Sequence, residues 1–263
     1  GPVSAWYIEP TTRYNHGILG DAIEAGGLLV VDAQGRQYQL SLPERYVFED
    51  ITPRLVDLDG DGRNEIVTIR NDVRAGAAVA IYDLDGDQLR ERAATAPLGQ
   101  PHRWLSIAAV ADFTADRGLE IAIVKTPHIG GVLEILSLEG NSLKSVRPPQ
   151  AGYSTHFIGS RDLSLAQTQD VYGDHFAELA LPTQDREHVM VLGFEPANHI
   201  VAAFNVVIFL QCALAYGISV ASRQCWVTCT LTPVLDLTDP ALVSQVMGMQ
   251  SCHEVVSAMP NSN

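Results

Sequence analysis

Lysine is nearly absent from this chain, which contains only Lys125 and Lys144. Lysine and arginine together number 17 against 31 aspartates and glutamates, and the formal net charge is −14. A surface of this sign repels phosphate backbones, and without a basic run it has no means of attachment to anionic lipid. The composition therefore argues against a nucleic-acid partner, while the surplus of carboxylates suits divalent cations.

Familiar catalytic motifs are also missing. The sequence has no H-E-x-x-H, G-x-S-x-G, phosphate-binding loop or dinucleotide fingerprint, and its eight histidines are scattered. Cys225, Cys229 and Cys252 with His253 have a spacing that suits zinc poorly. No cleavable signal peptide is visible, but the chain opens with Gly-Pro, which is typical of a mature or trimmed N-terminus. Export therefore stays open, and an extracellular or periplasmic location is expected.

A self-comparison reveals an internal repeat. Three windows align without gaps, each with acidic residues at positions one, five and nine and an apolar strand directly after position nine. The windows begin 55 and 58 residues apart. They cover residues 57–65, 112–120 and 170–178.

A second marker recurs at the same period, in the form of short apolar strands before a glycine, at 28–31, 79–82, 132–136 and 189–192. Each unit thus predicts four antiparallel strands, and no stretch shows helical periodicity. Units of this kind predict an all-β fold, namely a β-propeller with about four visible blades. Four blades are the lower limit for a closed ring, so membership of a larger ring stays open. In the second unit the strands are predicted at 53–57, 65–70, 77–82 and 88–92, and the last strand of the fourth unit at 199–204.

The first window has the ligand spacing of a calcium loop. Ca²⁺ takes about six to eight oxygen ligands in a flexible geometry. Carboxylates at positions one, three and five point inward as the backbone curls, and the glycine at position six permits the sharp turn. A carbonyl at position seven and a carboxylate at position nine can complete the shell. The predicted metal ligands are the side chains of Asp57, Asp59, Asp61 and Glu65 and the carbonyl of Arg63.

The run from Leu55 to Val67 resembles the D-x-D-G-D-G-x-x-[DE] core of FG-GAP/VCBS repeats, which occur in integrin α-subunits and in many exported bacterial proteins. The resemblance covers roughly residues 16–204. It implies a propeller fold, with Ca²⁺ as cofactor between the first two strands of a blade. The family usually has aspartate at position nine, and Glu65 is longer by one methylene, which loosens or shifts that ligand.

The two sister windows depart from the pattern. Thr114 stands at position three of the second window, and Arg117 replaces the glycine at position six. Tyr172 and His175 make the corresponding changes in the third window. Without a cation the remaining carboxylates repel one another, so these loops are expected to rely on hydrogen bonds. The acidic run at 83–87 imitates the motif but falls at the hairpin marker, and it is predicted to be a turn.

The character of the chain changes near residue 205. Only Arg223, Asp236, Asp239 and Glu254 are charged among the last 68 residues, and all four cysteines lie there. The predicted domains are an N-terminal arm (1–15), the propeller repeats (16–204) and a non-repeat, apolar tail (205–263). No regular blade is predicted in the tail. Three interpretations of it stay open: a membrane span at 200–222, a buried cap, or a segment from a shifted reading frame or fusion.

The resemblance favours a calcium-binding module of an exported protein that mediates adhesion or binding of an unknown protein or glycan. An enzyme acting on polysaccharide, a lyase or a hydrolase, is the alternative, and a truncated or chimeric product is a third. Fold alone does not decide between them, because function depends on the site. Carboxylates or histidines with shifted pKa values around the central channel would favour the enzyme. His102 and His156 precede their acidic loops in similar places and are interpreted as packing residues.

Overall fold

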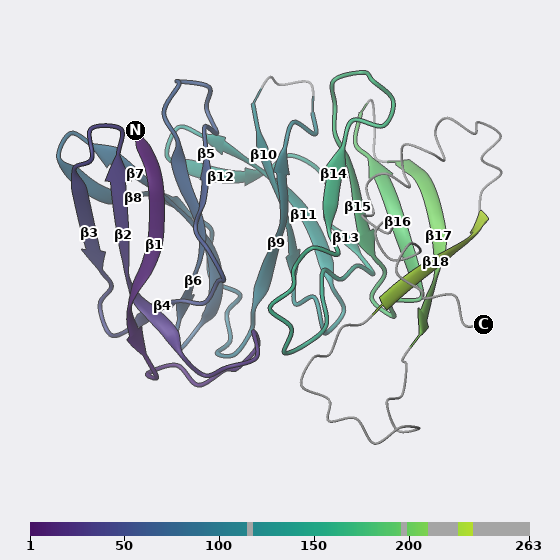
Figure 1. Ribbon diagram of the computed structural model, residues 1–263, viewed down its shortest axis with the longest axis horizontal. Coiled ribbons are helices and arrows are strands. Elements are labelled where there is room, and N and C mark those ends of the chain that lie inside the picture. Colours follow the sequence, from purple (N-terminus) through teal and green to yellow (C-terminus); the bar gives the residue numbers. More distant parts are fainter. Residues whose placement is uncertain (115–117, 196–198, 210–225, 234–263) are drawn as a thin grey trace, which may run out of the picture.

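The computed structural model describes residues 1–114, 118–195, 199–209 and 226–233 (Figure 1). These residues form strands β1 to β18 and no α-helix, so the predicted all-β class is confirmed. The described part of the chain accordingly has no helix that is long and apolar enough to cross a membrane.

The first sheet combines the first two repeat units. Its path is β1-β2-β4-β6-β7-β8, with β3 paired to β2 and β5 paired to β6. The short strand β4 joins the units, because it pairs with both β2 and β6. The strands are β1 (Pro2–Thr11), β2 (Glu24–Asp32), β3 (Gln37–Ser41), β4 (Tyr46–Phe48), β5 (Arg54–Val56), β6 (Glu65–Asp72), β7 (Gly76–Asp85) and β8 (Gln88–Ala94).

The third and fourth units form two further antiparallel sheets. Their orders are β12-β11-β10-β9, with β13 on β11, and β14-β15-β16-β17-β18. The strands are β9 (Leu105–Ala111), β10 (Glu120–Lys125), β11 (Val132–Glu139), β12 (Ser142–Ser145), β13 (Gln150–Ala151), β14 (Gln167–Gln169), β15 (Glu178–Pro182), β16 (His188–Gly193), β17 (His199–Phe209) and β18 (Trp226–Pro233).

Within units two to four, consecutive strands are neighbours in the sheet, as the repeat predicted. The strands of the second unit fall within a few residues of their predicted positions. In the acidic run at 83–87, predicted as a turn, Asp83 to Asp85 end β7 and pair with β8, and only Gly86 and Asp87 form the hairpin turn. One marker was wrong: Gly193 is the last residue of β16 and pairs with His199, so it is part of the ladder rather than of a turn.

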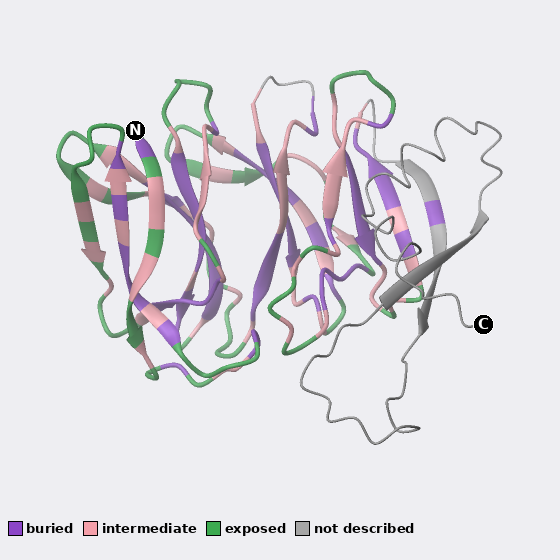
Figure 2. Cartoon of the chain, viewed as in Figure 1, coloured by how far each residue is buried: buried purple, intermediate pink, exposed green. Residues whose placement is uncertain are grey.

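The units lie side by side and share their apolar faces (Figure 1). Successive residues of a strand point to opposite faces of the sheet, and here both faces are covered. On β10, Ile121 and Ile123 pack toward the second unit, whereas Ala122 and Val124 pack toward the fourth. The central strands are therefore apolar throughout instead of alternating, and Figure 2 shows them as the buried part of the molecule. Face-to-face stacking of antiparallel sheets is the packing of a β-propeller-like fold.

The predicted segments at both ends of the chain contain strands of the sheets. Residues 1–15, predicted as an arm, contain β1, which pairs with β2 along its length, so its backbone groups are satisfied in the first sheet. At the other end β17 crosses residue 205 and continues to Phe209, and β18 adds a further strand beside it. The proposed membrane span begins inside β17. Residues 210–225 and 234–263 lie outside the described part, so the prediction for the tail stays a prediction.

The fold separates the loops into two groups. The three acidic loops connect the first two strands of units two, three and four, and they lie at the upper end of the sheets in Figure 1. The opposite end is built from the loops between units and the loops between second and third strands. Interactions between these loops reach across the molecule, since Gly159 donates its N–H to the carbonyl of Ile18 and Arg161 pairs with Asp21.

Candidate metal centre

The loop at 57–65 connects β5 to β6 and curls around its own carboxylates. Asp57 accepts hydrogen bonds from the backbone N–H groups of Asp61 (3.1 Å) and Gly62 (2.9 Å). Asp61 in turn accepts one from the N–H of Arg63 at 2.8 Å. Gly60 and Gly62 have φ values of 72° and 83°, and no atom lies within 4 Å of a Cβ built on either, so backbone conformation explains why glycine is used at both.

This curl brings together three of the predicted ligands. Carboxylate oxygens of Asp57, Asp59 and Asp61 lie within 4.8 Å of one another, on side chains that water can reach. Hard oxygen donors, gathered by a turn that orients each carboxylate with backbone N–H groups, fit the requirements of Ca²⁺. The donor set therefore fits the metal that the sequence predicted.

Glu65, the fourth predicted side-chain ligand, has other partners. It is buried, with its Oε2 accepting the N–H of Leu58 at 2.9 Å and its Oε1 accepting from Arg92 at 3.0 Å. Burial raises the pKa of the Glu65 carboxyl, and the hydrogen bond from Leu58 opposes the shift. Glu65 thus ties the second residue of the loop to the start of β6.

The same bond occurs in all three loops. Glu120 accepts the N–H of Phe113 and Glu178 accepts the N–H of Val171, each at 2.7 Å. Both glutamates are buried. We call this contact the glutamate clamp: position nine accepts the N–H of position two. The sequence held the signal, because glutamate rather than aspartate stands at position nine in every window, but its role was read as ligation.

The loop at 170–178 repeats these hydrogen bonds to backbone N–H groups but has no aspartate at position three. Asp170 accepts from the N–H groups of Asp174 (3.1 Å) and His175 (3.0 Å), and Asp174 accepts from Phe176 (3.0 Å). His175 has φ 79°, close to the value of the glycine at the same position of the first loop. Position three is Tyr172, half of which is exposed, so the loop keeps its shape while offering fewer oxygens.

The middle loop is only partly described, because residues 115–117 lie outside the described part. At its described end Thr114 donates its hydroxyl to Glu120, so a hydroxyl occupies the position that Asp59 holds in the first loop.

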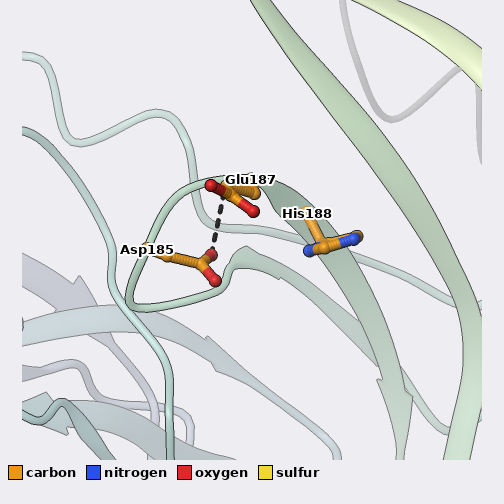
Figure 3. A group of neighbouring side chains, drawn as sticks. All are labelled: Asp185, Glu187 and His188. Atoms are coloured by element: carbon orange, nitrogen blue, oxygen red, sulfur yellow. Dashed lines mark hydrogen bonds between the residues drawn. The ribbon is translucent and has the colours of Figure 1, made fainter.

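A second group of possible ligand atoms lies in the hairpin between β15 and β16, where sequence reasoning had marked nothing. Asp185, Glu187 and His188 bring ligand atoms within 4.8 Å of one another (Figure 3). Asp185 is already engaged in the turn, since it accepts the N–H of Glu187 at 2.9 Å and the hydroxyl of Thr183 at 2.5 Å. All three follow one another along an exposed turn, and hydrogen bonding within the turn accounts for their proximity.

The loops at the opposite end of the sheets gather histidines. His16 pairs with the buried Glu49 at 2.8 Å, and the ring of His16 lies 5.3 Å from that of His102. The ring of His156 lies 4.6 Å from that of His128 and contacts Trp104.

Burial sets the protonation of this end. It lowers the pKa of His128 to about 4 and that of His156 to about 3, and the neighbouring Arg186 contributes to both shifts. Burial also raises the pKa of Glu24 to about 8. Burial therefore favours the neutral forms of His128, His156 and Glu24. His102 and His156, interpreted as packing residues, do pack here, but among other titratable groups.

Comparison with protein-family models gives one match: residues 57–123 match the FG-GAP-like repeat. The matched segment begins at the first aspartate of the calcium-type loop and ends in β10, so it contains both the first and the second acidic loop. No curated protein matches the chain.

Proposed function

Because the chain carries an FG-GAP-like repeat within an all-β, propeller-like fold, we propose that it is a calcium-stabilised binding module of an exported protein. The observation that carries the proposal is the cluster of Asp57, Asp59 and Asp61, whose carboxylate oxygens lie within 4.8 Å of one another. These side chains, with the carbonyl of Arg63, would hold the ion. Glu65 fixes the loop through its bonds to Leu58 and Arg92, and its remaining lone pairs would be free to face the ion.

The bound ion would supply positive charge to a group of like charges that otherwise repel. The residues of the chain do the rest: backbone N–H groups orient Asp57 and Asp61, and the glutamate clamp holds the loop against β6. A ligand that binds only the folded state raises stability by RT ln(1 + [L]/Kd), about 2.7 kcal/mol at a hundredfold excess over Kd. Extracellular calcium modules typically bind with Kd values of about 10⁻⁴ to 10⁻³ M, which suits an exported protein.

Thermal unfolding with calcium and with EDTA tests this role. The chelator should lower Tm by several degrees in the wild-type protein and leave Asp59→Ala unchanged between the two conditions. Asp85→Ala is the matched control, because Asp85 ends β7 beside the hairpin turn and lies outside the cluster. It should respond to EDTA as the wild-type protein does. An unchanged melting curve in EDTA would contradict the structural role of calcium.

The binding role would fall to the loops at one end of the sheets, because loops held by a rigid scaffold commonly carry binding residues. The repeat type and the absence of familiar catalytic motifs in the sequence support this binding role. A glycan array probed with labelled protein, in calcium and in EDTA, tests it: retention that requires calcium supports the module, and no retention of any glycan directs the search to protein ligands.

An enzyme acting on polysaccharide is the second candidate, and the histidine-rich end favours it. Glu49 fixes the ring of His16 at 2.8 Å, an arrangement that suits a general base. Incubation with uronate-containing and neutral polysaccharides, followed by ultraviolet absorbance and reducing-end assays, distinguishes lyase, hydrolase and inert protein. Activity that Glu49→Gln and His16→Ala abolish would establish the enzyme.

A further inference from the structure

Arg92 reaches the acidic loop from the last strand of its own unit. In the pairing of β7 with β8, Ile81 lies opposite Ala93 and Tyr82 opposite Glu91, so Arg92 is the extra residue of a β-bulge. Bulges twist a strand and redirect a side chain. This one turns the guanidinium toward the loop, and only 15% of the side chain is exposed.

The guanidinium bonds three groups. Its Nη2 donates to Asp59 at 2.7 Å and its Nη1 to Glu65 at 3.0 Å. Its Nε donates to the carbonyl of Gly140 at 3.2 Å, in the hairpin turn of the next unit. One side chain therefore connects position three of the loop, the glutamate clamp and the neighbouring repeat.

The bulge residue and position three differ together between the second and fourth units. In the third unit β11 pairs with β12 without a bulge, and Thr114 stands at position three. In the fourth unit the bulge lies at the corresponding place, between Val191 and Leu192, and its extra residue is Val201. That unit has Tyr172 at position three. An arginine at the bulge thus accompanies an aspartate at position three, and an aliphatic residue accompanies a tyrosine.

The charge of the residue at position three explains why an arginine at the bulge accompanies an aspartate there. In the first loop three clustered carboxylates and a buried glutamate lie near one another, and repulsion between them would open the loop when no cation is bound. A half-buried arginine held by two carboxylates neutralises part of this charge and interacts more strongly than an exposed ion pair would. Asp59 cannot give both of its oxygens to an ion while Oδ2 stays bound to Arg92.

We propose that Arg92 is the built-in counter-charge of Asp59: it holds this side chain in place without metal and competes with the divalent cation for its carboxylate, whereas Arg63, within the loop, pairs with Asp61. The inference rests on the proposed calcium site. It makes Arg92 a positioning residue that sets the affinity of the loop: the bond supports the metal-free fold, and it weakens the attraction of the loop for a cation. Through Gly140, the position of Arg92 is also linked to the contact with the next unit.

The Arg92→Gln variant separates the effect of Arg92 on the metal-free fold from its effect on calcium affinity. In EDTA the variant should melt below the wild-type protein, because the clustered carboxylates lose their counter-charge. In calorimetric titration with calcium the variant should bind roughly fivefold more tightly, since one positive charge a few ångströms from a divalent ion is removed. Arg90→Gln is the matched control: Arg90 lies on the same strand and pairs with Asp83 and Asp85 instead. It should leave calcium affinity unchanged.

A double-mutant cycle in EDTA tests the metal-free role separately. The melting loss caused by Arg92→Gln should shrink in an Asp59→Asn background, because the partner charge is already gone. Equal losses in both backgrounds would overturn the counter-charge role. If Arg92→Gln does not fold, Arg92→Lys keeps the charge without the bidentate reach, and it should bind calcium more tightly than the wild-type protein.

Failure of this inference is distinguishable from failure of the calcium site. Absence of calcium binding by the wild-type protein would overturn the site and, with it, the competition. Calcium binding by the wild-type protein together with equal or weaker binding by Arg92→Gln would overturn the competition alone.

Discussion

The acidic loops at 57–65 and 170–178 share one construction and differ in the groups that could hold a metal. In both, the first aspartate accepts the N–H groups of positions five and six, and the glutamate clamp closes the loop. Only the first has a carboxylate at position three, glycine at position six and an arginine at the bulge. The shape of the loop is thus built by the chain itself, and the capacity for a cation is added at position three.

Among the substitutions that test this comparison, removal of the glutamate clamp should cause the largest loss of stability. Glu65→Ala and Glu178→Ala each leave a buried backbone N–H without its acceptor, which costs about 1–3 kcal/mol. Chemical denaturation measures the loss, and the glutamine variants, which keep an acceptor oxygen, should lose less. A loss confined to one loop would show that the shared construction is not the source of stability.

Acid should act in opposite senses on the buried histidines and on the glutamates of the clamp. His128 and His156 have pKa values lowered by burial to about 4 and about 3, against about 6.5 in the unfolded chain. Between pH of about 6.5 and these values the unfolded chain binds protons that the folded chain does not, so stability is complete above this window and falls as the pH drops through it. Burial raises the pKa of Glu65 and Glu178, and the same drop in pH therefore does not cost stability there.

Melting curves across this window for the wild-type protein and His156→Gln measure the effect. The variant should show the shallower dependence on pH, because one buried titrating group is gone. An identical slope would mean that the acid response arises elsewhere in the molecule.

The residues at position six, Gly62 in the first loop and His175 in the loop at 170–178, can each be replaced to test the backbone conformation there. Gly62→Ala should cost about 1 kcal/mol, since φ is 83° and no neighbouring atom would clash with the added methyl group. His175→Gly should stabilise by a similar or smaller amount, because histidine holds φ 79° there. Denaturation midpoints of the two variants should move in opposite directions, and a shift in the same direction would contradict a conformational origin.

Tyr172→Asp should cause the smallest change in stability of these substitutions. It is also the most informative one about function, because it tests calcium binding. The side chain is half exposed, so the fold should tolerate the substitution. An aspartate there restores the D-x-D spacing, and calorimetry should then find a second, weaker calcium site. An unchanged stoichiometry would indicate that position three alone does not create a site.

Much of the fold could be predicted because the repeat fixes it. Strands β5 to β8 lie within a few residues of their predicted places, since glycine turns and apolar runs mark both ends of each strand. The strand β1 was missed as part of the sheet, because its partner β2 was visible in the sequence but the pairing of the two was not.

At the site, the sequence predicted that Asp57, Asp59 and Asp61 would lie together, because alternate spacing on a curled loop leaves few other arrangements. It predicted Glu65 as a ligand and did not predict its bond to Leu58, since a carboxylate that binds an ion and one that accepts a backbone N–H are the same chemical group. Arg92 escaped prediction altogether, because a bulge that depends on the pairing of two strands leaves no local signal.

Calorimetric titration with calcium tests the central claim most directly. The wild-type protein should bind one ion, Asp59→Ala should give no binding heat, and Asp174→Asn, in the sister loop, should bind as the wild-type protein does. Equal heats from the wild-type protein and Asp59→Ala would contradict the assignment of the metal to the loop at 57–65.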